Sequence, residues 1–256
     1  LGLVGSEMCI RDRKNVIPHD ENTLYIFITQ SGETSDTIKS AQKVKELSNL
    51  ATLCITNNEE STIWNLCDYK VACYAGTEQG IAATKSFTSQ MLCLILISLK
   101  LVEKIHGDNA TIGYKKSLFS LPAVVDKALA KREDIKKLAA ILAKENTIVI
   151  TADGISYSLA KEAALKIKET SYKNISAAIL GEFMHGHVAV LNNPSMLIYI
   201  AVDEISKRSV SNLNKIKEDY KSKLVIIGPA GEEVKPDCNI NIVSCLLYTS
   251  PSPRDR

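Results

Sequence analysis

The chain has 256 residues, of which 31 are Lys or Arg and 29 are Asp or Glu, so its formal net charge is only +2. Neither a nucleic-acid partner nor an anionic membrane surface is indicated, because both attract clustered positive charge. A chain of this length can bury one large core or two smaller ones.

The two ends of the chain are predicted not to be natural protein sequence. One short DNA sequence encodes CLLYTSPSPRD at 245–255, and its reverse complement encodes LVGSEMCIRD at 3–12. Agreement over this length is not expected by chance. We therefore interpret residues 1–13 and 245–256 as translated sequencing adapter, and expect the genuine segment to be an internal part of a longer protein.

The first predicted unit is a buried strand, a tight turn and a helix. Residues 24–29 are apolar or β-branched, and helical spacing begins after the turn. Free N–H groups at the start of a helix can bind an anion, and polar side chains of the turn can join them around a phosphate. The candidate phosphate-binding residues are Thr29, Gln30, Ser31 and Thr34. A Ser/Thr-rich N-cap turn without a ligand gives the same pattern.

Two more buried strands are predicted at 51–56 and 69–73. Apolar strands joined by helices imply parallel pairing and right-handed crossovers. Ligands of such sheets bind at the carboxyl ends of the strands. The turn at 29–34, the loop at 56–59 and the loop at 75–85 are therefore expected to share one crevice.

The third of these loops leads into a long helix, predicted to run to about Leu101. Lys85 near its start either neutralises a phosphate or pairs with Glu78, and the spacing alone favours the pairing. The apolar run at 91–99 is too short to cross a bilayer, so it is interpreted as a core helix.

The second half repeats the strand and helix alternation of the first. Buried strands are predicted at 148–150, 196–202, 223–227 and 240–243. The residues before 181 are predicted to form only a short connecting segment. Between the two ends there are five cysteines, an odd number without C-x-x-C spacing, which favours free thiols in a reducing compartment.

A charged stripe lies on the helix predicted at 157–172. Glu162, Lys166, Glu169 and Lys173 share one face, because steps of three and four residues return to the same side of a helix. Ion pairs on a wet surface explain this pattern. In a cleft, however, Lys166 would hold Glu169 ionised as a general base.

The segment GEFMHGH places His185 in a glycine-flanked loop. His185 and His187 alone do not make a metal site, since no third ligand stands at suitable spacing. A loop histidine that carries a proton is the favoured interpretation, because imidazole changes its charge near neutral pH.

Four segments taken together resemble the SIS (sugar isomerase) domain family, and within it the isomerase domains of glutamine:fructose-6-phosphate aminotransferases. They are TQSGETSDT from Thr29, AGTEQGIAATKSFTSQ from Ala75, EAALKIKETSY from Glu162 and GEFMHGHVAVL from Gly181. The resemblance implies an α/β fold of two tandem lobes, each a three-layer, flavodoxin- or Rossmann-like αβα unit with a parallel sheet. We expect the first lobe at 14–110, a helical connector at 111–145 and the second lobe at 146–244.

The resemblance also implies an activity. The family converts fructose 6-phosphate, with ammonia from glutamine, into glucosamine 6-phosphate for UDP-N-acetylglucosamine synthesis in the cytoplasm. It uses neither metal nor organic cofactor, and works as a homodimer with a shared active site.

Individual positions match the family's functional residues. Thr29, Gln30, Ser31 and Thr34 match its phosphate-binding turn, with Thr29 standing where a serine is usual, and Ile81 matches a position whose backbone lines the sugar site.

The catalytic positions lie in the second half. Glu169 matches the general base, with Lys166 beside it, and His185 matches the histidine of ring opening, which the partner subunit supplies in the family. His187 replaces a usual proline and Ala152 a usual glycine, which affects loop shape more than chemistry.

Two alternatives remain open at this point. SIS proteins without a glutaminase domain act as glucosamine-6-phosphate deaminases or fructosamine-phosphate deglycases, and other SIS modules bind sugar phosphates and regulate a partner without catalysis. The presence of Glu169 and His185 favours catalysis. The fragment alone is expected to be inactive, because parts of the first lobe and the closing tail are expected outside it.

Overall fold

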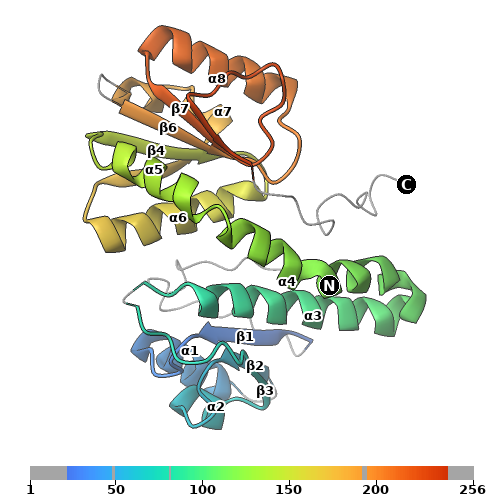
Figure 1. Ribbon diagram of the computed structural model, residues 1–256. Helices are drawn as coiled ribbons and strands as arrows, with labels where there is room; N and C mark the ends of the chain where they lie inside the picture. Colours follow the sequence, from blue (N-terminus) through green and yellow to red (C-terminus); the bar gives the residue numbers. More distant parts are fainter. Residues whose placement is uncertain (1–21, 48–49, 81, 192–194, 242–256) are drawn as a thin grey trace. The chain divides into compact units, whose positions relative to one another are not determined.

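The structure is a computed structural model, and it describes residues 22–47, 50–80, 82–191 and 195–241. The chain divides into two compact units between Ile105 and His106, and each unit has its own parallel sheet (Figure 1). The predicted α/β fold is confirmed. The predicted adapter segments at 1–13 and 245–256 lie outside the described residues.

Within the described residues, the sheet of the first unit has three strands in sequence order. Its elements are β1 (Leu24–Thr29), α1 (Ser35–Glu46), β2 (Ala51–Thr56), α2 (Thr62–Leu66), β3 (Tyr69–Ala72) and α3 (Lys85–His106). Helices α1 and α2 cover one face, where Ala41 and Ile63 pack on Cys54, and α3 covers the other through Cys93 (Figure 1). Layers of helix, sheet and helix result, because central strands of a parallel sheet must be buried on both sides.

Strand β1 is less covered than its neighbour β2. Leu24, Ile26 and Ile28 are 42%, 40% and 39% exposed, whereas Ile55 in β2 is fully buried. Among the described strands of this sheet β1 pairs only with β2, so its other edge keeps backbone groups available for pairing.

Helix α3 is longer and more exposed than the predicted core helix. Its length and composition would allow it to cross a membrane. Among the described residues no other helix meets that criterion. A single such helix is weak evidence, because core helices of soluble proteins meet the same criterion. Only 11% of its apolar stretch is buried, and Leu96, Leu101 and Ile105 are about half exposed or more.

The predicted connector is helical. Its 111–145 span contains α4 (Ile112–Leu129) and α5 (Arg132–Leu142), and η2 (Asp108–Thr111) directly precedes α4. Leu138 of α5 is buried in the core of the second unit, so α5 contributes to that unit's packing.

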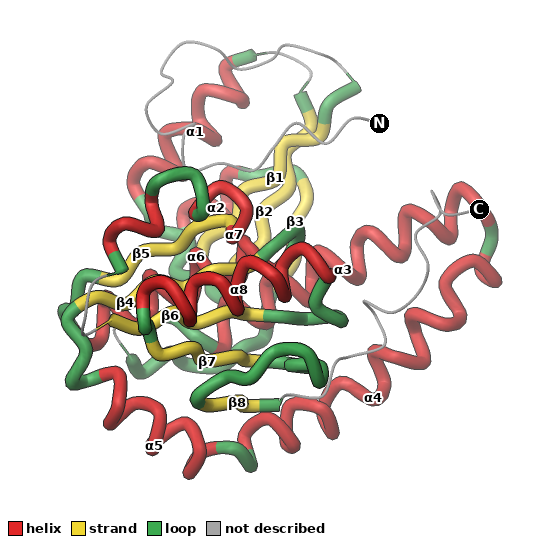
Figure 2. The backbone as a smooth tube through the Cα atoms, turned by 90° about the horizontal axis from the view of Figure 1, so that it is seen from above, coloured by secondary structure: helices red, strands yellow, loops and turns green. Residues whose placement is uncertain are grey.

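In the described part of the second unit, five parallel strands pair in the order β5, β4, β6, β7, β8 (Figure 2). Its elements are β4 (Thr147–Ala152), α6 (Ser156–Ser171), β5 (Ile175–Ile179), α7 (Leu180–Phe183), η3 (His187–Val190), β6 (Ser195–Ile200), α8 (Lys207–Tyr220), β7 (Lys223–Ile227) and β8 (Cys238–Ile240). Helices α5 and α6 cover one face, and α7 and α8 cover the other (Figure 1). The segment predicted as a connection before 181 is in fact the edge strand β5.

The two sheets share a repeated arrangement. Strands β1, β2 and β3 with helix α1 correspond to β6, β7 and β8 with helix α8, since each series pairs in parallel in the same order. Asp68 accepts a hydrogen bond of 3.0 Å from the backbone at the start of β2 and pairs with Lys45 of α1. Asp237 accepts one of 2.8 Å from the backbone of β7 and pairs with Lys217 of α8. This match aligns the turn after β1 with the turn after β6.

Candidate functional site

The turn after β1 is braced by its own hydroxyl groups. The Thr29 hydroxyl lies 3.1 Å from the Thr34 hydroxyl and accepts a 3.3 Å hydrogen bond from the Gly32 N–H. Thr29 is only 7% exposed, whereas Ser31 is exposed at the tip of the turn. Thr29 therefore holds the turn in shape while Ser31 remains accessible to a ligand.

The start of α1 is open to an anion. Thr34 is the N-cap residue of α1, yet its side chain makes no capping hydrogen bond to the helix. The N–H groups of a first helical turn have no partner inside the helix, and the helix dipole adds positive potential there. Together with the hydroxyls of Ser31 and Thr34 they can surround a phosphate.

Gly32 permits the close approach of this turn to α2. Its φ is +72°, and a Cβ atom at this position would lie 2.1 Å from the Oγ of Ser61 and 2.3 Å from its Cβ. The Gly32 carbonyl also accepts a 3.2 Å hydrogen bond from the N–H of Ile63. Only glycine fits here, because the backbone conformation and the space both exclude a side chain.

The three loops at the carboxyl ends of β1, β2 and β3 are joined through Asn57. Its N–H donates to the Gln30 carbonyl at 3.1 Å. Its side-chain amide donates to the Gly76 carbonyl and accepts from the Ala75 N–H, both at 2.8 Å. These loops therefore lie together, as the parallel sheet predicted. Ile81, the remaining predicted binding residue, lies outside the described residues.

The predicted pairing of Glu78 with Lys85 is not the main contact of Glu78. Its carboxylate accepts hydrogen bonds from the Ser86 hydroxyl at 2.8 Å and the Ser86 N–H at 3.2 Å. These bonds from Ser86 are the main reason why the pKa of Glu78 is below its ordinary value. The Glu78 carboxylate thus accepts hydrogen bonds from free N–H groups at the start of α3. Lys85 forms no ion pair with a described residue within 4 Å.

In the second unit, Lys166 of α6 lies between two carboxylates. Its Nζ is 2.8 Å from Glu169 and 3.6 Å from Glu162. The side chains of Lys166, Glu169 and Glu162 are 23%, 35% and 27% exposed. The hydrogen bond to Glu169 is the main cause that raises the pKa of Lys166, so Glu169 faces a stable positive charge.

Lys173 does not continue this stripe, contrary to the sequence pattern. Helix α6 ends at Ser171, and Tyr172 has a φ of +59°. The chain therefore changes direction, and the Nζ of Lys173 donates to the carbonyl of Glu145 at 2.9 Å instead.

His185 lies between α7 and η3 with an exposed side chain, and its N–H donates to the Glu182 carbonyl at 3.0 Å. The parts of the chain that the structure describes contain no cluster of three or more His, Cys, Asp or Glu that could hold a metal. Within those parts neither the His185 nor the His187 imidazole has a hydrogen-bond or ion-pair partner.

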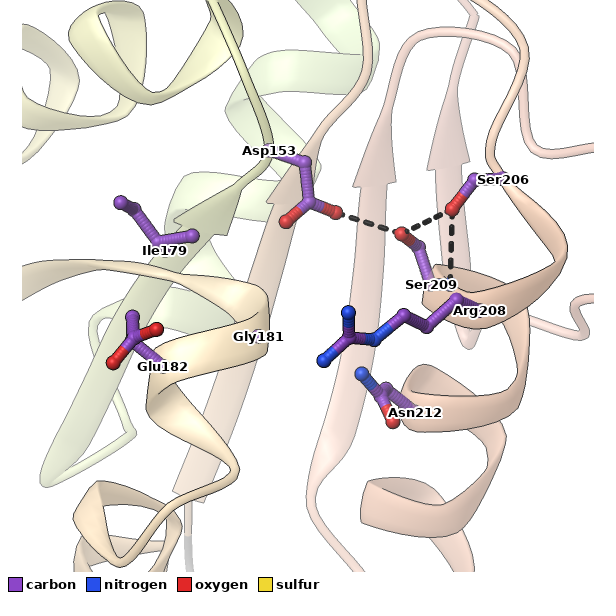
Figure 3. A pocket seen from close by; sticks show the side chains of 8 residues that line it. All are labelled: Asp153, Ile179, Gly181, Glu182, Ser206, Arg208, Ser209 and Asn212. Atoms are coloured by element: carbon purple, nitrogen blue, oxygen red, sulfur yellow. Dashed lines mark hydrogen bonds between the residues drawn. The ribbon is translucent and has the colours of Figure 1, made fainter.

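A cavity of about 290 Å³ opens at the carboxyl ends of β4 and β5 (Figure 3). It is lined by Asp153, Ile179, Gly181, Glu182, Ser206, Arg208, Ser209 and Asn212. The sequence patterns did not predict this cavity, because its residues come from three separate segments. Gly181 and Glu182 belong to the GEFMHGH motif, but no motif marks Asp153 or the start of α8.

The fold and the open turn define an α/β protein whose first unit can accept an anion at the carboxyl ends of parallel strands. The SIS domain family matches residues 11–99 and 141–244, and the chain belongs to this family.

Similar proteins agree with this assignment. The glutamine–fructose-6-phosphate aminotransferase (isomerizing) of Legionella pneumophila strain Lens is 34% identical over 207 residues, which cover 80% of this chain and 33% of the relative. The chain thus spans about a third of the length of that relative.

Solved structures show the same fold. The C-terminal domain of glucosamine-fructose-6-phosphate aminotransferase from Francisella tularensis has a TM-score of 0.83 at 29% identity, over 91% of this chain and 67% of that one. Glucosamine-6-phosphate deaminase from Thermotoga maritima has a TM-score of 0.67 at 22% identity, over 90% and 67%. At that lower identity the likeness concerns the fold alone.

Proposed function

We propose that this chain is the isomerase part of an enzyme that makes glucosamine 6-phosphate from fructose 6-phosphate and ammonia. Membership of the SIS family and the 34% identity to an isomerizing aminotransferase support this proposal. The release of ammonia from glutamine is left to sequence outside this chain. We propose the cytoplasm as the site of action.

The phosphate of the sugar would bind at the turn after β1. The first-turn N–H groups of α1 and the polar side chains of Gln30, Ser31 and Thr34 are the donors available there. Each hydrogen bond to a charged group contributes about 1.5–3 kcal/mol, so a few of them fix the phosphate end of the sugar. The backbone of Ile81 is proposed to line the sugar.

Glu169 would then move the proton. Ammonia adds to C2 of the open-chain ketose and water leaves, which gives an imine at C2. Glu169 removes a proton from C1 of the protonated imine to give an enaminol. Return of that proton to C2, with loss of the C1 hydroxyl proton, gives the aldehyde of the amino sugar. Lys166 would place its positive charge beside the Glu169 carboxylate before the carboxylate takes up the C1 proton.

His185 would assist ring opening in the site of a second copy of the chain, and we therefore propose a homodimer. Imidazole suits this role, because it can give and take a proton near neutral pH.

The observation that carries the proposal is the Glu169 carboxylate held 2.8 Å from the Lys166 ammonium on a partly buried helix face. In the polypeptide extended to the length of its relatives, Glu169→Gln should bind fructose 6-phosphate but lose about 10²- to 10⁴-fold in C1 proton exchange. Exchange in D₂O is followed by NMR.

Glu162→Gln is the matched control. It removes the other carboxylate at Lys166, 3.6 Å away, and should leave the exchange rate nearly unchanged. Undiminished exchange in Glu169→Gln, or equal losses in both variants, would exclude Glu169 as the base and leave a sugar-phosphate-binding module.

A further inference from the structure

The cavity of the second unit contains charges that the protein does not pair with one another. Arg208 is exposed and lines the cavity, as do the carboxylates of Asp153 and Glu182. Within the described ranges the Arg208 side chain makes no ion pair or hydrogen bond, and its guanidinium is 4.0 Å from where a Cβ on Gly181 would stand. Figure 3 shows the Arg208 side chain reaching from α8 toward the segment of Gly181.

Asp153 is held in a fixed orientation by two buried hydroxyl groups. One carboxylate oxygen, Oδ2, accepts from the Tyr199 hydroxyl at 3.0 Å and from the Ser209 hydroxyl at 2.7 Å. Tyr199 and Ser209 are only 4% and 5% exposed. The other oxygen, Oδ1, has no hydrogen bond to any residue in the described part of the chain. An acceptor oriented in this way needs little further ordering to bind a donor.

The protonation of Tyr199 supports this arrangement. Burial, and after it the neighbouring Asp153 carboxylate, raises the pKa of Tyr199 well above its ordinary value. The phenol therefore stays a donor to Asp153 at every pH at which the protein would work.

The cavity lies where the repeated arrangement puts the counterpart of the first unit's turn. Ser206, the N-cap residue of α8, corresponds to Thr34, the N-cap residue of α1. The first turns of α1 and α8 differ in one respect. The Ser206 hydroxyl accepts a hydrogen bond of 3.2 Å from the Ser209 N–H, whereas the Thr34 side chain makes no such capping bond. The start of α8 is thus capped by its own side chain, and the guanidinium of Arg208 is the strongest group for an anion at this place.

We propose that this cavity is a second site of the chain and binds an amino-sugar phosphate. Arg208 would bind the phosphate, as a guanidinium does through two parallel hydrogen bonds. Asp153 and Glu182 would accept from the ammonium and hydroxyl groups. A volume of about 290 Å³ is at the lower end for ligand pockets, which suits a single phosphorylated sugar and not a dinucleotide. Only the choice of ligand rests on the proposed function, because the product of that function, glucosamine 6-phosphate, is an amino-sugar phosphate.

The test measures binding of glucosamine 6-phosphate to the full chain by calorimetry. A variant with Ser31→Ala and Thr34→Ala weakens the proposed first-unit site and leaves the cavity intact. In that background Arg208→Gln should weaken binding by about tenfold or more, the effect of losing one charge-assisted contact. Lys207→Gln removes a neighbouring exposed charge that does not line the cavity, and should change affinity by less than about twofold.

The carboxylates are tested through ligand preference. The chain should bind glucosamine 6-phosphate more tightly than fructose 6-phosphate, and Glu182→Gln should remove most of this preference. In the Ser31→Ala, Thr34→Ala background, an affinity for glucosamine 6-phosphate that neither Arg208→Gln nor Lys207→Gln changes would overturn the second site. Equal affinities of that background for glucosamine 6-phosphate and fructose 6-phosphate would overturn the ligand class. Neither result depends on proton exchange by Glu169, so a failure here is distinct from a failure of the proposed reaction.

Discussion

Replacement of Gly32 by alanine tests whether the turn after β1 depends on its close approach to α2. The added Cβ would lie 2.1 Å from the Oγ of Ser61. Ser61 is fully buried and its hydroxyl donates to the Asn58 carbonyl at 2.7 Å. It cannot move aside without losing that hydrogen bond, so the turn itself has to shift.

Gly76 offers a matched control in the same unit. Its φ of +67° is close to the +72° of Gly32, but the nearest atom to its Cβ would be the flexible Nζ of Lys85 at 3.9 Å. Both alanines pay about 1–2 kcal/mol for the left-handed conformation, partly offset by about 0.4–1 kcal/mol from a less flexible unfolded chain. Only Gly32→Ala adds the overlap, which costs about 1–3 kcal/mol.

Urea unfolding followed by tryptophan fluorescence measures this difference. Trp64 is the sole tryptophan of the chain and packs against the core beside Ile63, so its emission reports the first unit. Gly32→Ala should be less stable than Gly76→Ala by about 1–3 kcal/mol and should weaken the binding of fructose 6-phosphate. Equal stabilities of the two variants would refute the argument from close packing at Ser61.

Two further predictions concern acid stability and thiol chemistry. Hydrogen bonding to Lys45, followed by that to Thr52, lowers the pKa of Asp68 to about 2. A group whose pKa is lower in the folded protein than in the unfolded chain stabilises the fold at pH values above its unfolded pKa. This contribution of Asp68 should therefore fade as the pH falls from about 4 toward 2. Asp68→Asn should therefore flatten the pH dependence of first-unit stability in that range, and an unchanged acid profile would contradict the pairing. Burial raises the pKa of Cys67 to about 11 and that of Cys73 to about 12, so both thiols should react with a disulfide reagent at pH 8 only as fast as the first unit opens. The partly exposed Cys238 should react earlier, and modification of Cys67 and Cys73 at the rate of Cys238 in native protein would count against this reasoning.

The elements that sequence alone predicted are those defined by local patterns. The strand at Leu24–Thr29, its turn and α1 follow one another directly, so apolar spacing and hydroxyl content were sufficient to place them. Strand β5 was missed because its sequence, ISAAI, has small residues and only two large apolar ones. An edge strand needs little apolar character, and its pairing with β4 was invisible to local spacing.

Contacts between distant segments could not be predicted from spacing. Glu78 and Lys85 stand at a distance that suits a pair, but the hydroxyl and N–H of Ser86 offered two donors in place of one exposed cation. The cavity around Arg208 escaped notice for a related reason. It exists only because the parallel sheet brings the ends of β4 and β5 beside the start of α8.

The repeated arrangement of the two sheets has a practical consequence for protein engineering. Tyr25 of β1 pairs with Thr52, and Leu197 of β6 pairs with Leu224. The number of residues from Tyr25 to Thr34 equals the number from Leu197 to Ser206. The loops after β1 and β6 can therefore be exchanged without insertion or deletion, on a framework whose Asp–Lys braces already match. A chimaera that carries TQSGET in place of AVDEIS would ask whether ligand recognition in this family resides in six transplantable residues or in the lobe that surrounds them.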